Sequence, residues 1–149
     1  MENYILEMRN IRKTFLGGKV VANDDVTLRI AKGEKHAIVG ENGAGKSTLL
    51  NILGCLDTPS DGEYYLDGIS VRKMGKNERA TLRNRKIGFI FQSYNLLAKT
   101  TAVENVELPL MYNPDISAKD RHQRAIKALQ DVGLGDRLNH KSNQMSGGQ

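Results

Sequence analysis

Residues 40–48, GENGAGKST, constrain the fold of this 149-residue chain more than any other segment. They match the pattern G-x-x-x-x-G-K-[ST]. A short apolar run, Ala37–Val39, precedes them, and apolar residues recur at helical spacing from Lys46 to Leu56. A strand, a glycine-rich loop and a helix are therefore predicted in that order. This succession is typical of the α/β class.

The residue types of this loop suit the binding of phosphate. Because glycine has no β-carbon, Gly40, Gly43 and Gly45 let backbone N–H groups turn inward around phosphate oxygens. The helix that follows directs its free N–H groups and positive dipole end at the same anion. Lys46 can reach the β- and γ-phosphates, and the Ser47 hydroxyl can bind Mg²⁺. The predicted ligand is a nucleoside triphosphate with magnesium, bound by Gly40, Glu41, Asn42, Gly43, Ala44, Gly45, Lys46, Ser47 and Thr48.

An ordinary turn with a surface lysine is the alternative interpretation of the same pattern. The strand and helix predicted on either side disfavour it, because this setting is what identifies a phosphate-binding loop.

Composition excludes several other classes of protein. No stretch approaches the roughly 18 apolar residues of a membrane span. The single cysteine, Cys55, excludes an internal disulfide and fits a reducing compartment, and the N-terminus does not resemble a signal peptide. The net charge is +5, but the basic residues are scattered. Their densest group, between Arg79 and Lys86, is interpreted as a solvated helix end rather than a nucleic-acid site. The histidines are too dispersed to predict a metal site.

The rest of the first part predicts mainly strands. Ile5–Asn10 and Val26–Ile30 alternate apolar and polar residues, and a turn follows the second at residues 31–34. Residues 63–71 predict a hairpin around Asp67-Gly68. Ile87–Phe91 is another apolar run of strand length.

From about residue 94 the pattern becomes helical. Thr101 and Glu104 form a capping box ahead of an apolar pattern. Ser117 can cap a second helix, which should end at Gly133. One domain is therefore expected, with a mixed α/β part over residues 1–93 and a helical part over residues 94–149.

Three further segments carry a resemblance to a known family. Residues 145–149, MSGGQ, resemble the signature Leu-Ser-Gly-Gly-Gln of ATP-binding cassette (ABC) ATPases, with Met145 replacing leucine of similar volume. Gln92 directly follows the Ile87–Phe91 run, where this family has its Q-loop glutamine. Phe15 resembles the A-loop aromatic that stacks on adenine, although a core aromatic is the alternative at that position.

The resemblance to ABC transporter ATP-binding subunits implies a fold and a mechanism. The fold would be a RecA-like P-loop NTPase core with an antiparallel β subdomain and a helical subdomain. ATP and Mg²⁺ would be the ligands, with Gln92 and Ser47 helping to place the metal and Gln92 the attacking water. Two ATPase subunits, as a homodimer or a heterodimer, would pair head to tail. The signature of one would then contact the partner's γ-phosphate through Ser146, Gly147, Gly148 and Gln149.

The resemblance also implies a membrane partner. A transmembrane permease subunit would meet the segment 93–103, which places the protein on the cytoplasmic face of the membrane. Residues 53–59 and 88–97 resemble the macrolide-exporter and lipoprotein-releasing group, whereas residues 21–24 and 40–45 resemble sugar and nucleoside importers. The direction of transport, import or export, is therefore not predicted. A soluble ABC ATPase acting on ribosomes or DNA, and a nucleotide-binding module without turnover, are the other candidates.

The family's catalytic glutamate has no counterpart before Gln149. Members carry an apolar strand ending in Asp-Glu beyond the signature, and the glutamate acts there as general base. The interpretation is a truncated ABC ATPase, with an incomplete fold and no turnover by itself.

Overall fold

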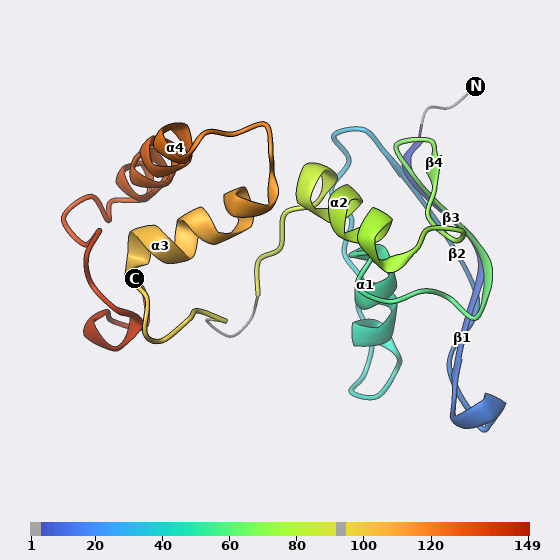
Figure 1. Cartoon of the computed structure of the whole chain (residues 1–149). Coiled ribbons are helices and arrows are strands. Elements are labelled where there is room, and N and C mark those ends of the chain that lie inside the picture. Colours follow the sequence, from blue (N-terminus) through green and yellow to red (C-terminus); the bar gives the residue numbers. More distant parts are fainter. Residues whose placement is uncertain (1–3, 92–94) are drawn as a thin grey trace. The chain divides into compact units, whose positions relative to one another are not determined.

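The computed structural model describes residues 4–91 and 95–149, which divide into two compact units (Figure 1). The first comprises residues up to Gly88, and the second comprises Phe89–Gln149. Each unit has its own hydrophobic core.

The first unit contains a four-stranded antiparallel sheet in the order β2-β1-β3-β4. The strands are β1 (Tyr4–Phe15), β2 (Val20–Ala31), β3 (Asp61–Leu66) and β4 (Ile69–Ser70), and a short 3-10 turn, η1 (Leu16–Gly18), joins the first two. The strands predicted at Ile5–Asn10 and Val26–Ile30 and the hairpin at Asp67-Gly68 are confirmed, although β1 and β2 are longer than the alternation indicates.

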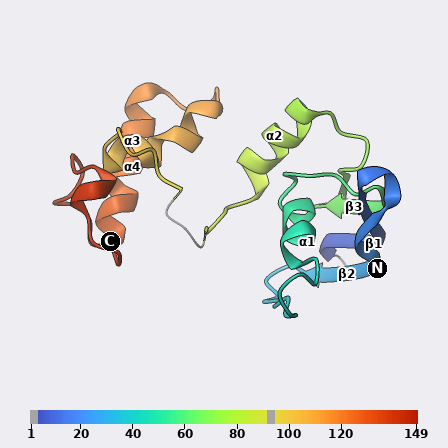
Figure 2. The same ribbon diagram turned by 90° about the horizontal axis from the view of Figure 1, so that it is seen from below.

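Two helices, α1 (Lys46–Leu53) and α2 (Lys76–Lys86), lie on the same side of this sheet (Figures 1 and 2). Leu49 and Ile52 of α1 and Leu82 of α2 pack with buried sheet residues such as Met8 and Tyr64. The Tyr64 hydroxyl donates to the Leu53 carbonyl over 2.7 Å, and burial raises the pKa of Tyr64. Cys55 is also fully buried in this core, and burial raises the pKa of its thiol. A buried thiol of this kind is chemically quiet.

Two predicted strands are wrong. Neither Ala37–Val39 nor Ile87–Phe91 has strand structure. An extended segment becomes a strand only when a neighbour accepts and donates its backbone hydrogen bonds. No strand among the described residues pairs with either run. Their side chains are correspondingly uncovered: Val39 is 91% exposed and Ile90 is fully exposed. The sheet formed by the described residues is therefore antiparallel throughout.

The second unit is helical. Its elements are α3 (Ala102–Glu107), η2 (Leu108–Tyr112), α4 (Ala118–Asp131) and η3 (Ser142–Gln144). The predicted capping box is confirmed: Thr101 accepts from the Glu104 N–H over 3.3 Å, and Glu104 accepts from the Thr101 N–H over 2.7 Å. The Glu104 carboxylate also accepts from the Thr101 hydroxyl over 2.9 Å, and the bonds from the Thr101 N–H and hydroxyl lower the pKa of Glu104, the backbone bond most.

The second predicted helix is also confirmed. Ser117 caps α4 by accepting from the Asp120 N–H over 3.1 Å. The helix ends just before Gly133, which adopts a left-handed φ of +78°. Helix α4 packs on α3 through Ala125 and Leu129, which cover Val103.

Candidate functional site

The glycine-rich loop leads directly into α1, as the sequence predicts. Helix α1 begins at Lys46, immediately after Gly45, which has a left-handed φ of +77°. The Ala44 N–H donates to the Glu41 carbonyl over 3.2 Å, so the loop makes a tight turn before the helix. Residues 40–48 therefore form one continuous structure, and the first-turn N–H groups of an eight-residue helix open onto it.

Strand β2 braces this loop at Gly45. Thr14 pairs with Val21 and Lys13 pairs with Asn23, which leaves Ala22 as the extra residue of a β-bulge. A β-carbon added at Gly45 would lie 2.1 Å from the Ala22 carbonyl oxygen. Only glycine fits so close to another backbone, and this contact fixes where the loop turns into the helix.

Asn23, beside the bulge, also holds the loop, and the sequence does not predict this role. Its side chain is 7% exposed, and its Nδ2 donates to the Gly45 carbonyl over 3.3 Å. The buried Oδ1 of Asn23 has no hydrogen-bond partner among the described residues. A buried carbonyl without a partner costs about 1–3 kcal/mol. Asn23 lies outside the strand predicted at Val26–Ile30, and the register that turns it toward the loop cannot be read from the sequence.

Lys46 is folded back over its own loop. Its ammonium donates to the Gly40 carbonyl and, over 3.0 Å, to the Glu41 carbonyl. The positive charge is thus held at the loop, against two neutral acceptors. A phosphate oxygen carries negative charge and is a stronger acceptor than either carbonyl. Ser47 is exposed on the first turn of α1, whereas Thr48 is partly covered.

Phe15 is the last residue of β1. The tip of the β1–β2 hairpin lies at the same end of the first unit as the loop that leads into α1 (Figure 1). The Phe15 side chain is 41% exposed and belongs to neither hydrophobic cluster, which disfavours the core interpretation. The ring instead lies 5.1 Å from the Lys13 ammonium, measured to the ring centroid.

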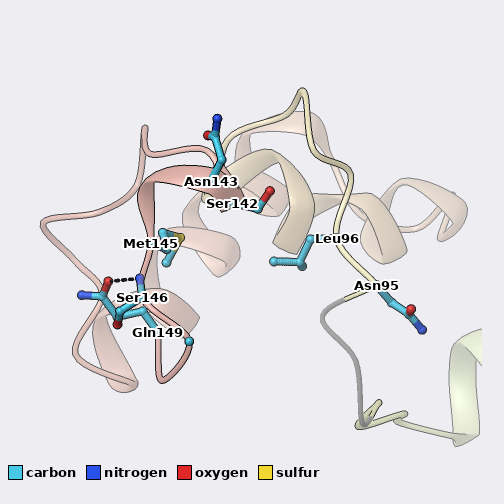
Figure 3. Close-up of a pocket in the computed structure, with 8 residues that line it drawn as sticks. Asn95, Leu96, Ser142, Asn143, Met145, Ser146 and Gln149 are labelled. Carbon is cyan, nitrogen blue, oxygen red and sulfur yellow. Dashed lines mark hydrogen bonds between the residues drawn. The ribbon is translucent and has the colours of Figure 1, made fainter.

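The signature-like residues lie in the second unit, where they form a single exposed turn. The Ser146 N–H donates to Oε1 of Gln149 over 2.9 Å, and the Gln149 N–H donates to the Ser146 carbonyl over 3.0 Å (Figure 3). Beside the turn is a cavity of about 460 Å³, lined by Asn95, Leu96, Ser142, Asn143, Met145, Ser146, Gly147 and Gln149.

Backbone hydrogen bonds attach the preceding segment to α3. Thr101 and Lys141 form an isolated antiparallel bridge, and the Ala102 N–H donates to the His140 carbonyl over 2.8 Å. The start of α3 therefore positions the segment that leads to the signature turn. Gln92, predicted to help place magnesium and water, lies outside the described residues.

Residues 4–91 and 95–149 contain neither a membrane-spanning helix nor a clustered set of metal-ligating side chains. None of the helices there is long and apolar enough to cross a membrane. No cluster of three or more His, Cys, Asp or Glu side chains there could hold a metal ion.

A family model and individual related proteins point to the same family. Residues 23–149 match the model described as ABC transporter. The chain is 50% identical over 147 residues to an uncharacterized ABC transporter ATP-binding protein of Thermotoga maritima, covering 97% of this chain and 62% of that protein. It is 49% identical to the macrolide export ATP-binding/permease protein MacB of Brucella abortus, covering 97% of this chain and 23% of MacB.

Solved structures agree with the sequence matches. The ATP-binding cassette MJ0796, in a dimeric post-hydrolysis state bound to ADP and Pi, superposes with a TM-score of 0.84 at 44% identity. That match covers 97% of this chain and 64% of the cassette chain. The architecture is that of the ABC cassette, a P-loop NTPase fold with an antiparallel β subdomain and helices. The chain spans less than two thirds of the length of these relatives.

Proposed function

Because the chain belongs to the ABC transporter family, we propose that it binds MgATP at residues 40–48 as the ATP-binding part of a transporter. The observation that carries this proposal is the glycine loop, which is braced at Gly45 and opens onto the N-terminus of α1 with the Lys46 ammonium beside it. Loop amides and the helix N-terminus would hold the phosphates, and Lys46 would exchange its carbonyl acceptors for phosphate oxygens.

The donor set at the loop fits magnesium bound together with a nucleotide. Mg²⁺ is usually held by one or two protein oxygens together with substrate phosphates, rather than by a cage of side chains. The Ser47 hydroxyl on the first turn of α1 would be such a ligand. Gln92 is proposed as a second group near the metal and the water. When bound, the ion would neutralise phosphate charge.

In the complete transporter, we propose that two cassettes pair head to tail and hydrolyse ATP. Residues 146–149 of one subunit would cover the nucleotide held at residues 40–48 of the other. The exposure of the signature turn suits such a role, and so does the dimeric state of the MJ0796 structure bound to ADP and Pi. We assign no general base within residues 1–149, so the property to test in this chain is binding rather than turnover.

The membrane partner is proposed from the relatives. MacB is named as an ATP-binding and permease protein. By analogy, this chain would work with a permease at the cytoplasmic face of a membrane, contacting it through the segment 93–103. The two relatives quoted above include a macrolide export protein, which supports a permease of the exporter type.

Nucleotide titration by isothermal calorimetry tests the binding proposal. Wild-type chain should bind MgATP, and Lys46→Ala should weaken binding about tenfold or more, because a charge-assisted contact worth about 1.5–3 kcal/mol is lost. Lys127→Ala is the matched control, since Lys127 is an exposed lysine of α4 that pairs with Asp131. Equal ATP affinity in wild type and Lys46→Ala would contradict the site.

A further inference from the structure

Lys13 is partly buried near the tip of β1, two residues before Phe15. Its side chain is 12% exposed, which is unusual for lysine. The ammonium donates to Oδ1 of Asp57 over 2.9 Å and to the Thr58 carbonyl over 2.8 Å. Burial raises the pKa of Asp57, but hydrogen bonds from Lys13 and the Thr58 N–H outweigh it and leave that pKa lowered. The ammonium is therefore clamped in one place.

This clamped charge also lies against the Phe15 ring. The Lys13 Nζ is 5.1 Å from the ring centroid, within the range of a cation–π contact. Residues two apart on a strand point to the same face, which explains how the two side chains meet. Phe15 is 41% exposed and belongs to neither hydrophobic cluster, so little of its ring is covered by core packing.

The backbone of β1 is attached to the same region by other means. The Ser60 N–H donates to the Arg12 carbonyl over 2.8 Å, and the Thr14 N–H donates to the Ser60 hydroxyl over 3.0 Å. These bonds hold residues 12–14 beside residues 57–60 whether or not Lys13 carries a charge. The Lys13 ammonium is thus not the only group that attaches β1 to residues 57–60. Its contact with the Phe15 ring can therefore serve a purpose other than this attachment.

The anchor of the clamp comes from the end of the helix that begins at the glycine loop. Asp57 follows α1, and its N–H donates to the Asn51 carbonyl of that helix over 3.1 Å. Lys13 therefore connects the Phe15 ring to the same helix that begins at the glycine loop.

We propose that Lys13 is a positioning residue for the nucleobase: clamped by Asp57 and Thr58, its ammonium occupies one face of Phe15 and leaves the other face to stack on adenine. This inference rests on the proposed function. It concerns only the base, so it predicts different results for ATP and for inorganic tripolyphosphate, which has no base.

The test is a double-mutant cycle on Lys13 and Phe15, with both ligands titrated by calorimetry at fixed ionic strength. Lys13→Met should weaken ATP binding about two- to fivefold, the scale of an exposed cation–π contact. It should leave tripolyphosphate binding unchanged, and it should have no further effect in a Phe15→Ala background. Lys13→Arg should retain ATP affinity. Lys19→Met, which removes the same charge from an exposed residue of the same hairpin, should leave ATP binding as in wild type.

Several results would overturn the inference alone. Lys13→Met could weaken ATP and tripolyphosphate equally, or could weaken ATP by the same factor with and without Phe15; either result would make Lys13 a structural tie. Unchanged ATP binding in Lys13→Met, with weaker binding in Phe15→Ala, would also overturn it. A wild-type chain that binds neither ligand would instead overturn the proposed function, and this inference with it.

Discussion

The glycine loop of the first unit and the signature turn of the second are both short glycine-containing segments, but they are held in different ways. The loop is fixed by distant parts of the chain, since Gly45 lies against the Ala22 carbonyl and accepts a hydrogen bond from Asn23. The signature turn is closed by hydrogen bonds between Ser146 and Gln149, three residues apart, and its residues are exposed. Contacts with residues far away in the sequence therefore shape the glycine loop, whereas local hydrogen bonds shape the signature turn.

The largest expected effect on stability distinguishes Gly45 in the glycine loop from Gly148 in the signature turn. Gly45→Ala should cost about 2–4 kcal/mol of the free energy of unfolding, because its β-carbon would meet the Ala22 carbonyl and its φ of +77° is unfavourable. ATP affinity should fall as well. Gly148→Ala, where nothing lies within 4 Å, should change stability by no more than about 0.5 kcal/mol. Urea denaturation measures both, and equal losses would contradict the difference drawn here.

Asparagine offers a second comparison of the two regions. Asn23→Ala removes the bond to Gly45 and leaves space in a buried site, but it also removes the partnerless Oδ1, so we expect a net loss of no more than about 1 kcal/mol. Asn143→Ala, at an exposed position beside the signature turn, should change stability by less than about 0.5 kcal/mol. If Asn23→Ala does not lower the free energy of unfolding, the hydrogen bond from Asn23 does not stabilise the loop. The contact between Gly45 and Ala22 would then hold it.

The helix cap at Thr101 tests how the signature turn is supported. Thr101→Ala should cost about 1 kcal/mol through loss of the N-cap. Because the Glu104 N–H loses its Thr101 acceptor and the Ala102 N–H bonds to His140, hydrogen exchange should accelerate at residues 101–104 while the glycine loop stays unchanged. Ser117→Ala is the control, since it removes the cap of α4 but not the bridge to Lys141. Identical exchange patterns in the two variants would show that the bridge does not depend on α3.

The smallest expected effect is the pH dependence of the stability that Asp57 contributes. The folded-state pKa of Asp57 is lowered, so its contribution is fully present above the unfolded-state pKa of about 3.9 and is lost as the pH falls through the folded-state pKa. The stability advantage of wild type over Asp57→Asn should therefore be constant near neutral pH and shrink below about pH 4. In a Lys13→Met background this shrinkage should disappear. Thermal unfolding between pH 3 and 7 measures the difference, and an advantage that grows in acid would reverse the sign assigned here.

Local chemistry in the sequence predicts much of this structure. The helix from Lys46, the hairpin at Asp67-Gly68 and the caps at Thr101 and Ser117 each depend on a few neighbouring residues, and all four are confirmed. The family resemblance is likewise confirmed by the sequence and structure matches.

What the sequence could not predict depends on partners far along the chain. The runs Ala37–Val39 and Ile87–Phe91 have the composition of strands, but composition does not supply a hydrogen-bonding neighbour. Asn23 reaches Gly45 only because a bulge at Ala22 sets the local register. Lys13 meets Phe15 through a clamp whose carboxylate lies 44 positions away in sequence. Register and long-range contacts of this kind have no signature in a single segment.

We propose above all that a pre-shaped loop at residues 40–48 holds the phosphates of ATP. Hydrogen exchange of the wild-type chain with and without MgATP tests it most directly. We predict slower exchange at the amides of residues 41–48 on ATP binding, absent in Lys46→Ala. ATP-dependent protection confined to residues 95–96 and 142–149, with the glycine loop exchanging as fast as before, would contradict the account.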